Sequence, residues 1–130
     1  MALVKFIEYA DASPEVRAVY DDIMATRKVD WITNFWKALA SDPVTLKRTW
    51  DSVKQVMAPG ALDPLVKEML YVAISATNGC DYCVASHTAA ARKAGMTDAM
   101  YGELMAVVGM ANETNALANG FRVPVDKQFL

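Results

Sequence analysis

The sequence predicts an all-α fold, a single-domain bundle of about six helices, and three observations support this prediction. Apolar residues recur at spacings of three and four along most of the chain, the pattern of helices that bury one face. Helix-starting and helix-stopping residues separate these stretches at short intervals. No stretch competes as a strand. Because the chain has 130 residues and is 54% hydrophobic, residues 1–130 are expected to build one core and one domain.

Three helices are expected in the first half of the chain. The first, over residues 13–26, opens with Ser-Pro, an N-cap followed by proline at the first helical position. The second, over residues 31–39, is unusually aromatic, and we expect its aromatic side chains to lie mostly in the core. The third, over residues 42–57, opens with Asp-Pro and ends before a Pro-Gly pair. The aromatic residues of the second helix are Trp31, Phe35 and Trp36.

Three more helices are expected in the second half. The fourth, over residues 63–77, opens with Asp-Pro and is apolar almost all round, so we expect it at the buried centre of the bundle. Asn78-Gly79 then favours a reversal into an antiparallel helical hairpin. The fifth helix is expected over residues 80–95, and the sixth over residues 97–120 behind a threonine cap. The expected inner face of the sixth helix consists of Tyr101, Leu104, Met105 and Val108.

Both chain ends carry large apolar side chains. Residues 1–12 are too apolar for a free tail, so we expect them to pack against another part of the protein. Residues 121–130 contain a proline and have loosely spaced apolar residues, so they are not expected to be helical throughout.

Charge and hydropathy exclude several classes of partner. The formal net charge is −2, from 13 basic and 15 acidic residues spread along the chain. This balance gives no electrostatic footprint for nucleic acid or for an anionic membrane, so neither is expected as a partner. The N-terminus lacks the apolar core of a signal peptide, and no apolar run approaches the ~20 residues of a membrane span. We therefore expect a cytoplasmic protein.

Both cysteines and the only histidine lie close together in the sequence. Cys80, Cys83 and His87 fall at positions i, i+3 and i+7, so all three project from one face of a helix that starts near the first cysteine. In a reducing cytosol two cysteines with this spacing are more often catalytic or metal-binding than a permanent disulfide. A C-x-x-C pair at a helix start also lowers a thiol pKa.

The predicted hairpin brings a carboxylate to this cluster. In a hairpin that turns at Gly79, His87 pairs with about Tyr71, and Glu68 is then less than one helical turn away, at ~1.5 Å per residue. The sequence therefore permits a connected set of carboxylate, imidazole and two thiols, which would be a proton relay ending in a redox pair. Three other interpretations remain open. The cysteines could be small buried hydrophobes, the four residues could bind zinc, and Glu68 could be a solvated residue in the first turn of its helix.

The pattern of these residues is familiar. Glu68, eleven residues, Cys80-Asp81-Tyr82-Cys83, three residues and His87 resemble the signature of the AhpD-like alkylhydroperoxidases within the carboxymuconolactone decarboxylase family. The match is tight from residue 67 to about residue 95 and looser over the flanking helices. The resemblance implies an AhpD-like helical fold. Tyr82 is a departure, because some members of the family have a second histidine there.

The resemblance also implies roles for the four residues. Helix-terminus physics favours a thiolate on Cys80, whereas the resemblance implies that Cys83 is the peroxidatic cysteine and Cys80 the resolving one. We follow the resemblance, because His87 lies one turn from Cys83 and two turns from Cys80, so direct help from a general base favours Cys83. His87 would then be the base and Glu68 the proton relay. No cofactor or metal is expected.

The predicted function is a thiol-dependent peroxidase that reduces hydrogen peroxide or alkyl peroxides. The reductant would be a dithiol, and similarity to known members suggests a lipoyl-bearing protein, with a thioredoxin-like protein as the alternative. Two other hypotheses are a lactone decarboxylase, which leaves the C-x-x-C unexplained, and a non-catalytic redox or zinc-binding module. A single bundle cannot cover all the apolar faces, and similar proteins form trimers or hexamers. We therefore expect a homo-oligomer, favour a hexamer, and expect residues 3–9 and 121–130 at its contacts.

Overall fold

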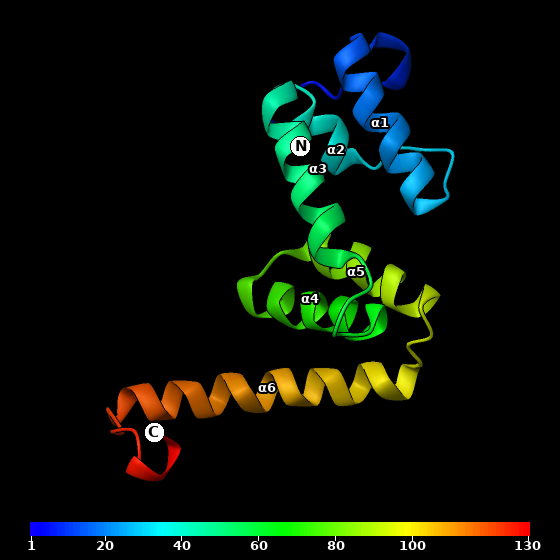
Figure 1. Ribbon diagram of the computed structural model, residues 1–130. Helices are drawn as coiled ribbons and strands as arrows, with labels where there is room; N and C mark the ends of the chain where they lie inside the picture. Colours follow the sequence, from blue (N-terminus) through cyan, green and yellow to red (C-terminus); the bar gives the residue numbers. More distant parts are fainter. The chain divides into compact units, whose positions relative to one another are not determined.

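The computed structural model describes all residues from 1 to 130 and contains six α-helices, two short 3₁₀ helices and no strand (Figure 1). The all-α prediction with six helices is confirmed. The chain divides into two compact units, residues 1–58 and residues 59–130, and the expectation of a single domain stays a prediction. The elements are η1 (Tyr9–Asp11), α1 (Pro14–Arg27), α2 (Asn34–Leu39), α3 (Pro43–Met57), α4 (Pro64–Asn78), α5 (Asp81–Lys93), α6 (Asp98–Gly120) and η2 (Lys127–Phe129).

Four helices begin where a capping side chain was predicted. In each of them the side-chain oxygen of the N-cap residue accepts a hydrogen bond from a backbone N–H in the first turn, which would otherwise have no partner within the helix. Proline follows three of these four caps, at a position where its missing N–H costs nothing. The capping residues are Ser13 before α1, Asp42 before α3, Asp63 before α4 and Thr97 before α6.

The second unit contains all four candidate site residues and is built on a helical hairpin. Helix α4 ends at Gly79, which has φ 70° and ψ 32°, a left-handed conformation that glycine adopts without strain. The chain reverses there, and α5 packs back along α4. Helix α6 follows a second left-handed glycine, Gly95, and also packs against α4. The predicted antiparallel hairpin is therefore confirmed.

Helix α4 is less buried than predicted. Only Val72 and Ser75 are buried on it, whereas three large apolar side chains on the same helix remain well exposed. The reason is geometric: within this unit α5 and α6 pack against α4, and two helices cannot enclose a third on all sides. The prediction of a helix buried at the centre of a bundle is therefore wrong for the single chain. The exposed residues are Val66 (42%), Leu70 (47%) and Ile74 (59%).

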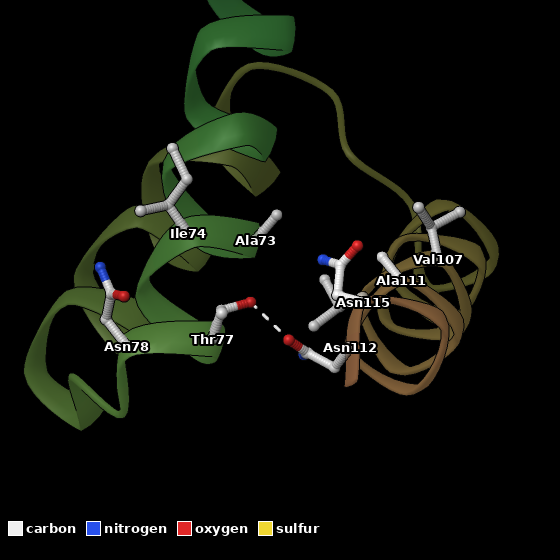
Figure 2. Close-up of a pocket in the computed structure, with 9 residues that line it drawn as sticks. Ala73, Ile74, Thr77, Asn78, Val107, Ala111, Asn112 and Asn115 are labelled. Carbon is white, nitrogen blue, oxygen red and sulfur yellow. Dashed lines mark hydrogen bonds between the residues drawn. The ribbon is translucent and has the colours of Figure 1, made fainter. Parts of the chain in front are cut away.

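A groove of about 250 Å³ runs between α4 and α6. Its walls are small and apolar residues with three asparagines, and no charged side chain lines it. Asn112 on α6 donates a hydrogen bond of 3.5 Å to the hydroxyl of Thr77 on α4 (Figure 2). Because the groove contains no acid, base or thiol, it is not a candidate for a reactive site.

Helix α6 continues beyond the part that packs on α4. Its predicted inner-face residues are half-buried, whereas residues 111–120 and the tail 121–130 are exposed throughout. The tail contains only the short helix η2, so the prediction that it is not helical throughout is confirmed. None of the helices combines the length and the apolar composition needed to cross a membrane.

The first unit has a conventional aromatic core. Helices α1, α2 and α3 meet around Tyr20, Trp36 and Trp50, each at most 2% exposed, and the two tryptophan rings pack edge to face with centroids 5.5 Å apart. The N-terminal segment joins this core, because the Tyr20 hydroxyl donates a hydrogen bond to the Ile7 carbonyl at 2.8 Å. The expected packing of residues 1–12 is thus confirmed for their second half, while residues 1–5 are exposed.

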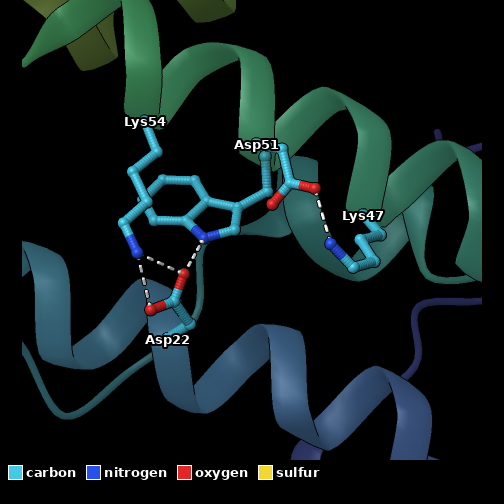
Figure 3. A network of polar contacts seen from close by, with 5 residues as sticks. Asp22, Lys47, Asp51 and Lys54 are labelled. Atoms are coloured by element: carbon cyan, nitrogen blue, oxygen red, sulfur yellow. Dashed lines mark hydrogen bonds and ion pairs between the residues drawn. The ribbon is translucent and has the colours of Figure 1, made fainter.

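One carboxylate ties α1 to α3 at the edge of this core (Figure 3). Asp22 accepts a 2.6 Å hydrogen bond from the indole N–H of Trp50 and two bonds of 2.9 Å from the Lys54 ammonium. These donors, Lys54 first, hold the pKa of Asp22 below its ordinary value because they stabilise the ionised form. The buried indole thereby obtains the partner that it needs.

The second predicted helix differs from expectation in its start and in its burial. Lys28 adopts a left-handed conformation with φ 56° after α1, and the chain stays non-helical until α2 begins at Asn34 rather than at Trp31. Trp31 therefore lies outside the helix and is 59% exposed, and Phe35 is 39% exposed. Of the predicted aromatic stripe only Trp36 is a core residue.

Candidate functional site

The two cysteines occupy the N-terminus of α5. Cys80 is the N-cap residue, and its sulfur accepts a 3.3 Å hydrogen bond from the backbone N–H of Cys83. Both cysteines are free thiols and are half-buried. Sulfur in this position replaces the oxygen of a usual capping residue, and the positive end of the helix dipole favours negative charge there. The cap therefore fixes the Cys80 sulfur at the positive end of α5, beside the backbone of Cys83.

Cys83 has the opposite environment. Burial, followed by the hydrogen bond and the charge of neighbouring Cys80, together raise the pKa of its thiol to about 11. The two thiols therefore interact, because ionisation of Cys80 opposes ionisation of Cys83. At neutral pH the Cys83 thiol keeps its proton unless a base removes it.

A carboxylate and an imidazole form the second half of the site. Glu68 Oε2 lies 2.7 Å from His87 Nδ1, and the two side chains are only 19% and 16% exposed. The rings of Tyr71 and His87 stack with centroids 3.5 Å apart at an angle of 15°. Both contacts agree with the register predicted for a hairpin that turns at Gly79. The predicted hydrogen bond between Glu68 and His87 is present without a bridging water.

The hydrogen bond fixes the chemistry of the imidazole. A carboxylate only accepts hydrogen bonds, so Nδ1 of His87 donates and carries the hydrogen. In the neutral ring Nε2 then has the free lone pair and is the atom that takes up a proton. The arrangement can act as a base backed by a negative charge, which stabilises the imidazolium once it forms.

The structure joins the four residues as two pairs. One pair is Cys80 with Cys83, and the other is Glu68 with His87, which lies one helical turn after the second cysteine on α5. The imidazole makes no hydrogen bond to either sulfur in this structure. Such bonds often tighten only when substrate is bound.

The arrangement of these side chains weakens two of the interpretations left open by the sequence. No group of three or more His, Cys, Asp or Glu side chains is arranged so that it could hold a metal ion. The zinc interpretation needs such a group, because a structural zinc ion takes four protein ligands. Likewise Glu68 is not a solvated residue of the first helical turn, since it is largely buried against His87.

Sequence reasoning missed one member of the site. Tyr71 was placed opposite His87 by the hairpin register, but an aromatic residue inside an apolar run is normally read as core. The stack on His87 shows that its ring belongs to the site.

The fold and the site together define an all-α protein in which a helical hairpin carries two thiols and a carboxylate–imidazole pair. The chain belongs to the carboxymuconolactone decarboxylase family, whose model matches residues 43–126 and so includes all four candidate residues. A solved structure agrees over almost the whole chain. The alkylhydroperoxidase AhpD core from Rhodospirillum rubrum ATCC 11170 is 52% identical, with 99% of this chain and 97% of that chain covered and a TM-score of 0.96. No curated protein matches.

Proposed function

We propose that this protein is a thiol-dependent peroxidase that reduces hydrogen peroxide or alkyl hydroperoxides with the Cys80–Cys83 dithiol. The observation that carries the proposal is the free dithiol at the start of α5, one helical turn before the His87 imidazole, which is hydrogen-bonded to the Glu68 carboxylate. The similarity to an alkylhydroperoxidase core supports the same reaction class. A lactone decarboxylase would use the same family fold but would give the dithiol no task.

The first step oxidises Cys83. Its thiolate attacks the terminal oxygen of the peroxide, the O–O bond breaks, and the sulfur becomes a sulfenic acid. The leaving oxygen takes a proton and departs as water or an alcohol. His87 suits both proton movements, since Nε2 first accepts the thiol proton and then, as the imidazolium, donates one to the leaving oxygen.

The raised pKa of Cys83 is what makes a base necessary. A thiol with a pKa of about 11 is almost entirely protonated at neutral pH, and only the thiolate attacks peroxides. Glu68 contributes by stabilising the positive charge on His87 while the proton resides there. In this proposal Cys83 is peroxidatic, His87 is the general base and Glu68 completes the relay.

The second step uses Cys80. Its sulfur attacks the sulfenic acid, a disulfide forms, and water leaves with the oxygen taken from the peroxide. The cap geometry favours this step, because Cys80 Sγ already lies 3.3 Å from the backbone nitrogen of Cys83. A reduced dithiol then restores both thiols and is itself oxidised. We propose a lipoyl-bearing or thioredoxin-like protein as this donor.

Peroxide consumption by the reduced protein tests the proposal. We expect wild type to turn over hydrogen peroxide or an organic hydroperoxide only when dihydrolipoamide or thioredoxin is supplied. Cys83→Ser should consume peroxide no faster than the double Cys80→Ser/Cys83→Ser control. Cys80→Ser should react once and stop. No consumption with either donor, or decarboxylation of a carboxymuconolactone by wild type and double variant alike, would reject the peroxidase in favour of a reaction without redox chemistry.

A further inference from the structure

Two residues of α4 hold the same imidazole. Glu68 and Tyr71 are three positions apart, so both project from one side of the helix, and both reach His87 on α5. Glu68 bonds the edge of the ring at Nδ1 over 2.7 Å. The phenol ring of Tyr71 covers its face, with centroids 3.5 Å apart and planes 15° from parallel.

The hydrogen bond alone would not orient the base. Rotation of a histidine ring about its terminal torsion is broad and roughly two-fold, and a single hydrogen bond leaves the ring free to swing about the bond. A flat aromatic surface at stacking distance removes that freedom, because any swing drives the ring edge into the tyrosine. The edge contact and the face contact together set the direction in which Nε2 points.

We propose that Tyr71 is the positioning residue for His87: its ring holds the imidazole in the plane from which Nε2 serves the Cys83 thiol. The positioning role of Tyr71 rests on the proposed function, whereas the stacking contact is observed independently of it. An aromatic face also attracts positive charge, so the same contact suits the imidazolium that forms when the thiol proton is taken up. The ring of Tyr71 carries this role, and phenylalanine should therefore replace it.

Nuclear magnetic resonance tests the stack directly, because His87 is the only histidine in the chain. In wild type labelled at histidine, we expect the His87 ring protons to be shifted upfield of free histidine by the ring current of Tyr71. Tyr71→Phe should keep that shift and Tyr71→Leu should lose it. Tyr101→Leu, a half-buried tyrosine of α6 in the same unit, should leave it unchanged. A wild-type signal at the position of free histidine overturns the proposal.

Alkylation of Cys83 tests the role without any peroxide. In a Cys80→Ser background, the rate of reaction with iodoacetamide near neutral pH should fall by about 10- to 100-fold in Tyr71→Leu, the usual cost of a misplaced catalytic group. Tyr71→Phe should stay near the parent rate. At alkaline pH, where the thiol ionises without a base, all three rates should converge. Equal neutral-pH rates for leucine and parent, or a phenylalanine variant as slow as leucine, contradict the proposal. A protein that shows these alkylation effects but consumes no peroxide would reject only the proposed function.

Discussion

Cys83 is the residue whose chemistry depends most on its surroundings. Burial and Cys80 both hold its pKa high, so at neutral pH the thiol stays in its protonated, unreactive form unless a base removes the proton. Such a thiol resists unwanted oxidation, since susceptibility follows thiolate character. The same contacts predict how the thiol titrates.

Removing Cys80 should lower the pKa of Cys83. The neighbouring sulfur raises this pKa through its hydrogen bond and its charge, so Cys80→Ser removes the negative charge that opposes ionisation, while burial still acts. The midpoint of Cys83 thiolate formation, followed by ultraviolet absorbance, should therefore move down from about 11 but stay above the ordinary value of 9.0. A midpoint that stays the same or rises would show that Cys80 does not oppose ionisation of Cys83.

The carboxylate and the imidazole should matter more for rate than for stability. His87→Ala should slow oxidation of Cys83 by about 10² to 10⁴-fold, the usual contribution of a general base, and Glu68→Gln by roughly 10-fold, since it keeps the side-chain shape but loses the charge. Stopped-flow measurement of thiol oxidation gives both rates. Glu103→Gln, an exposed glutamate of α6, is the matched control and should react like wild type. If Glu68→Gln also matches wild type, Glu68 is not part of the relay.

The α4–α5 hairpin is the element that assembles the site. Its turn glycine fixes which residues of the two helices face each other, and this register brings Glu68 and Tyr71 to His87. Because the left-handed turn sets the register, the turn itself should be sensitive to substitution.

A pair of glycine substitutions should have opposite effects on stability. Gly79→Ala should destabilise the protein by about 1–2 kcal/mol, because φ 70° is unfavourable for a residue with a Cβ. The added Cβ itself would meet no neighbouring atom within 4 Å, so the cost comes from the backbone conformation. Gly102→Ala, within the N-terminal part of α6 and equally free of neighbours at the added Cβ, should stabilise by ~0.5–1 kcal/mol. Urea unfolding measures both. Two changes of the same sign would mean that the turn conformation is not what matters at Gly79.

The elements were predictable to different degrees. Helix starts marked by a cap and proline were found because these residues act locally, as at Ser13, Asp42 and Asp63. The start of α2 was missed because no capping side chain marks it: Thr33 occupies the N-cap position without a side-chain hydrogen bond. In the site, spacing and one turn glycine sufficed to pair Glu68 with His87. The sequence did not show that Glu68–His87 and Cys80–Cys83 form two separate hydrogen-bonded pairs, because side-chain torsions decide whether the imidazole reaches a sulfur.

At the scale of the whole molecule the exposed apolar surface is the main feature to explain. The outer face of α4, residues 111–120 of α6 and the tail 121–130 are open to solvent in the single chain. Monomers rarely leave contiguous apolar patches of this kind exposed. We therefore infer that the burial expected for α4 from the sequence would come from other copies of the chain. The large exposed apolar residues of α6 and the tail are Val107, Met110, Leu117, Phe121, Val123, Val125, Phe129 and Leu130.

We propose that the protein is a closed homo-oligomer, a hexamer in preference to a trimer, with residues 3–9 and 121–130 among the contacts. Light scattering of the purified protein should give a mass several times that of the 14.2 kDa chain, constant on moderate dilution. Deletion of residues 121–130 should lower that mass or make it depend on concentration. A mass equal to one chain at all concentrations would refute the proposal.

The most direct test of the dithiol peroxidase is mass spectrometry of the reduced protein after one equivalent of hydrogen peroxide. Wild type should lose two hydrogens and yield a peptide in which Cys80 and Cys83 are joined. Cys80→Ser should instead gain one oxygen, trapped by dimedone at Cys83, and Cys83→Ser should remain unmodified over the same time. Dimedone trapping at Cys80 in Cys83→Ser, with no oxidation of Cys83 in Cys80→Ser, would contradict the assignment of the two thiols. A wild-type protein that remains unmodified would contradict the peroxidase activity itself.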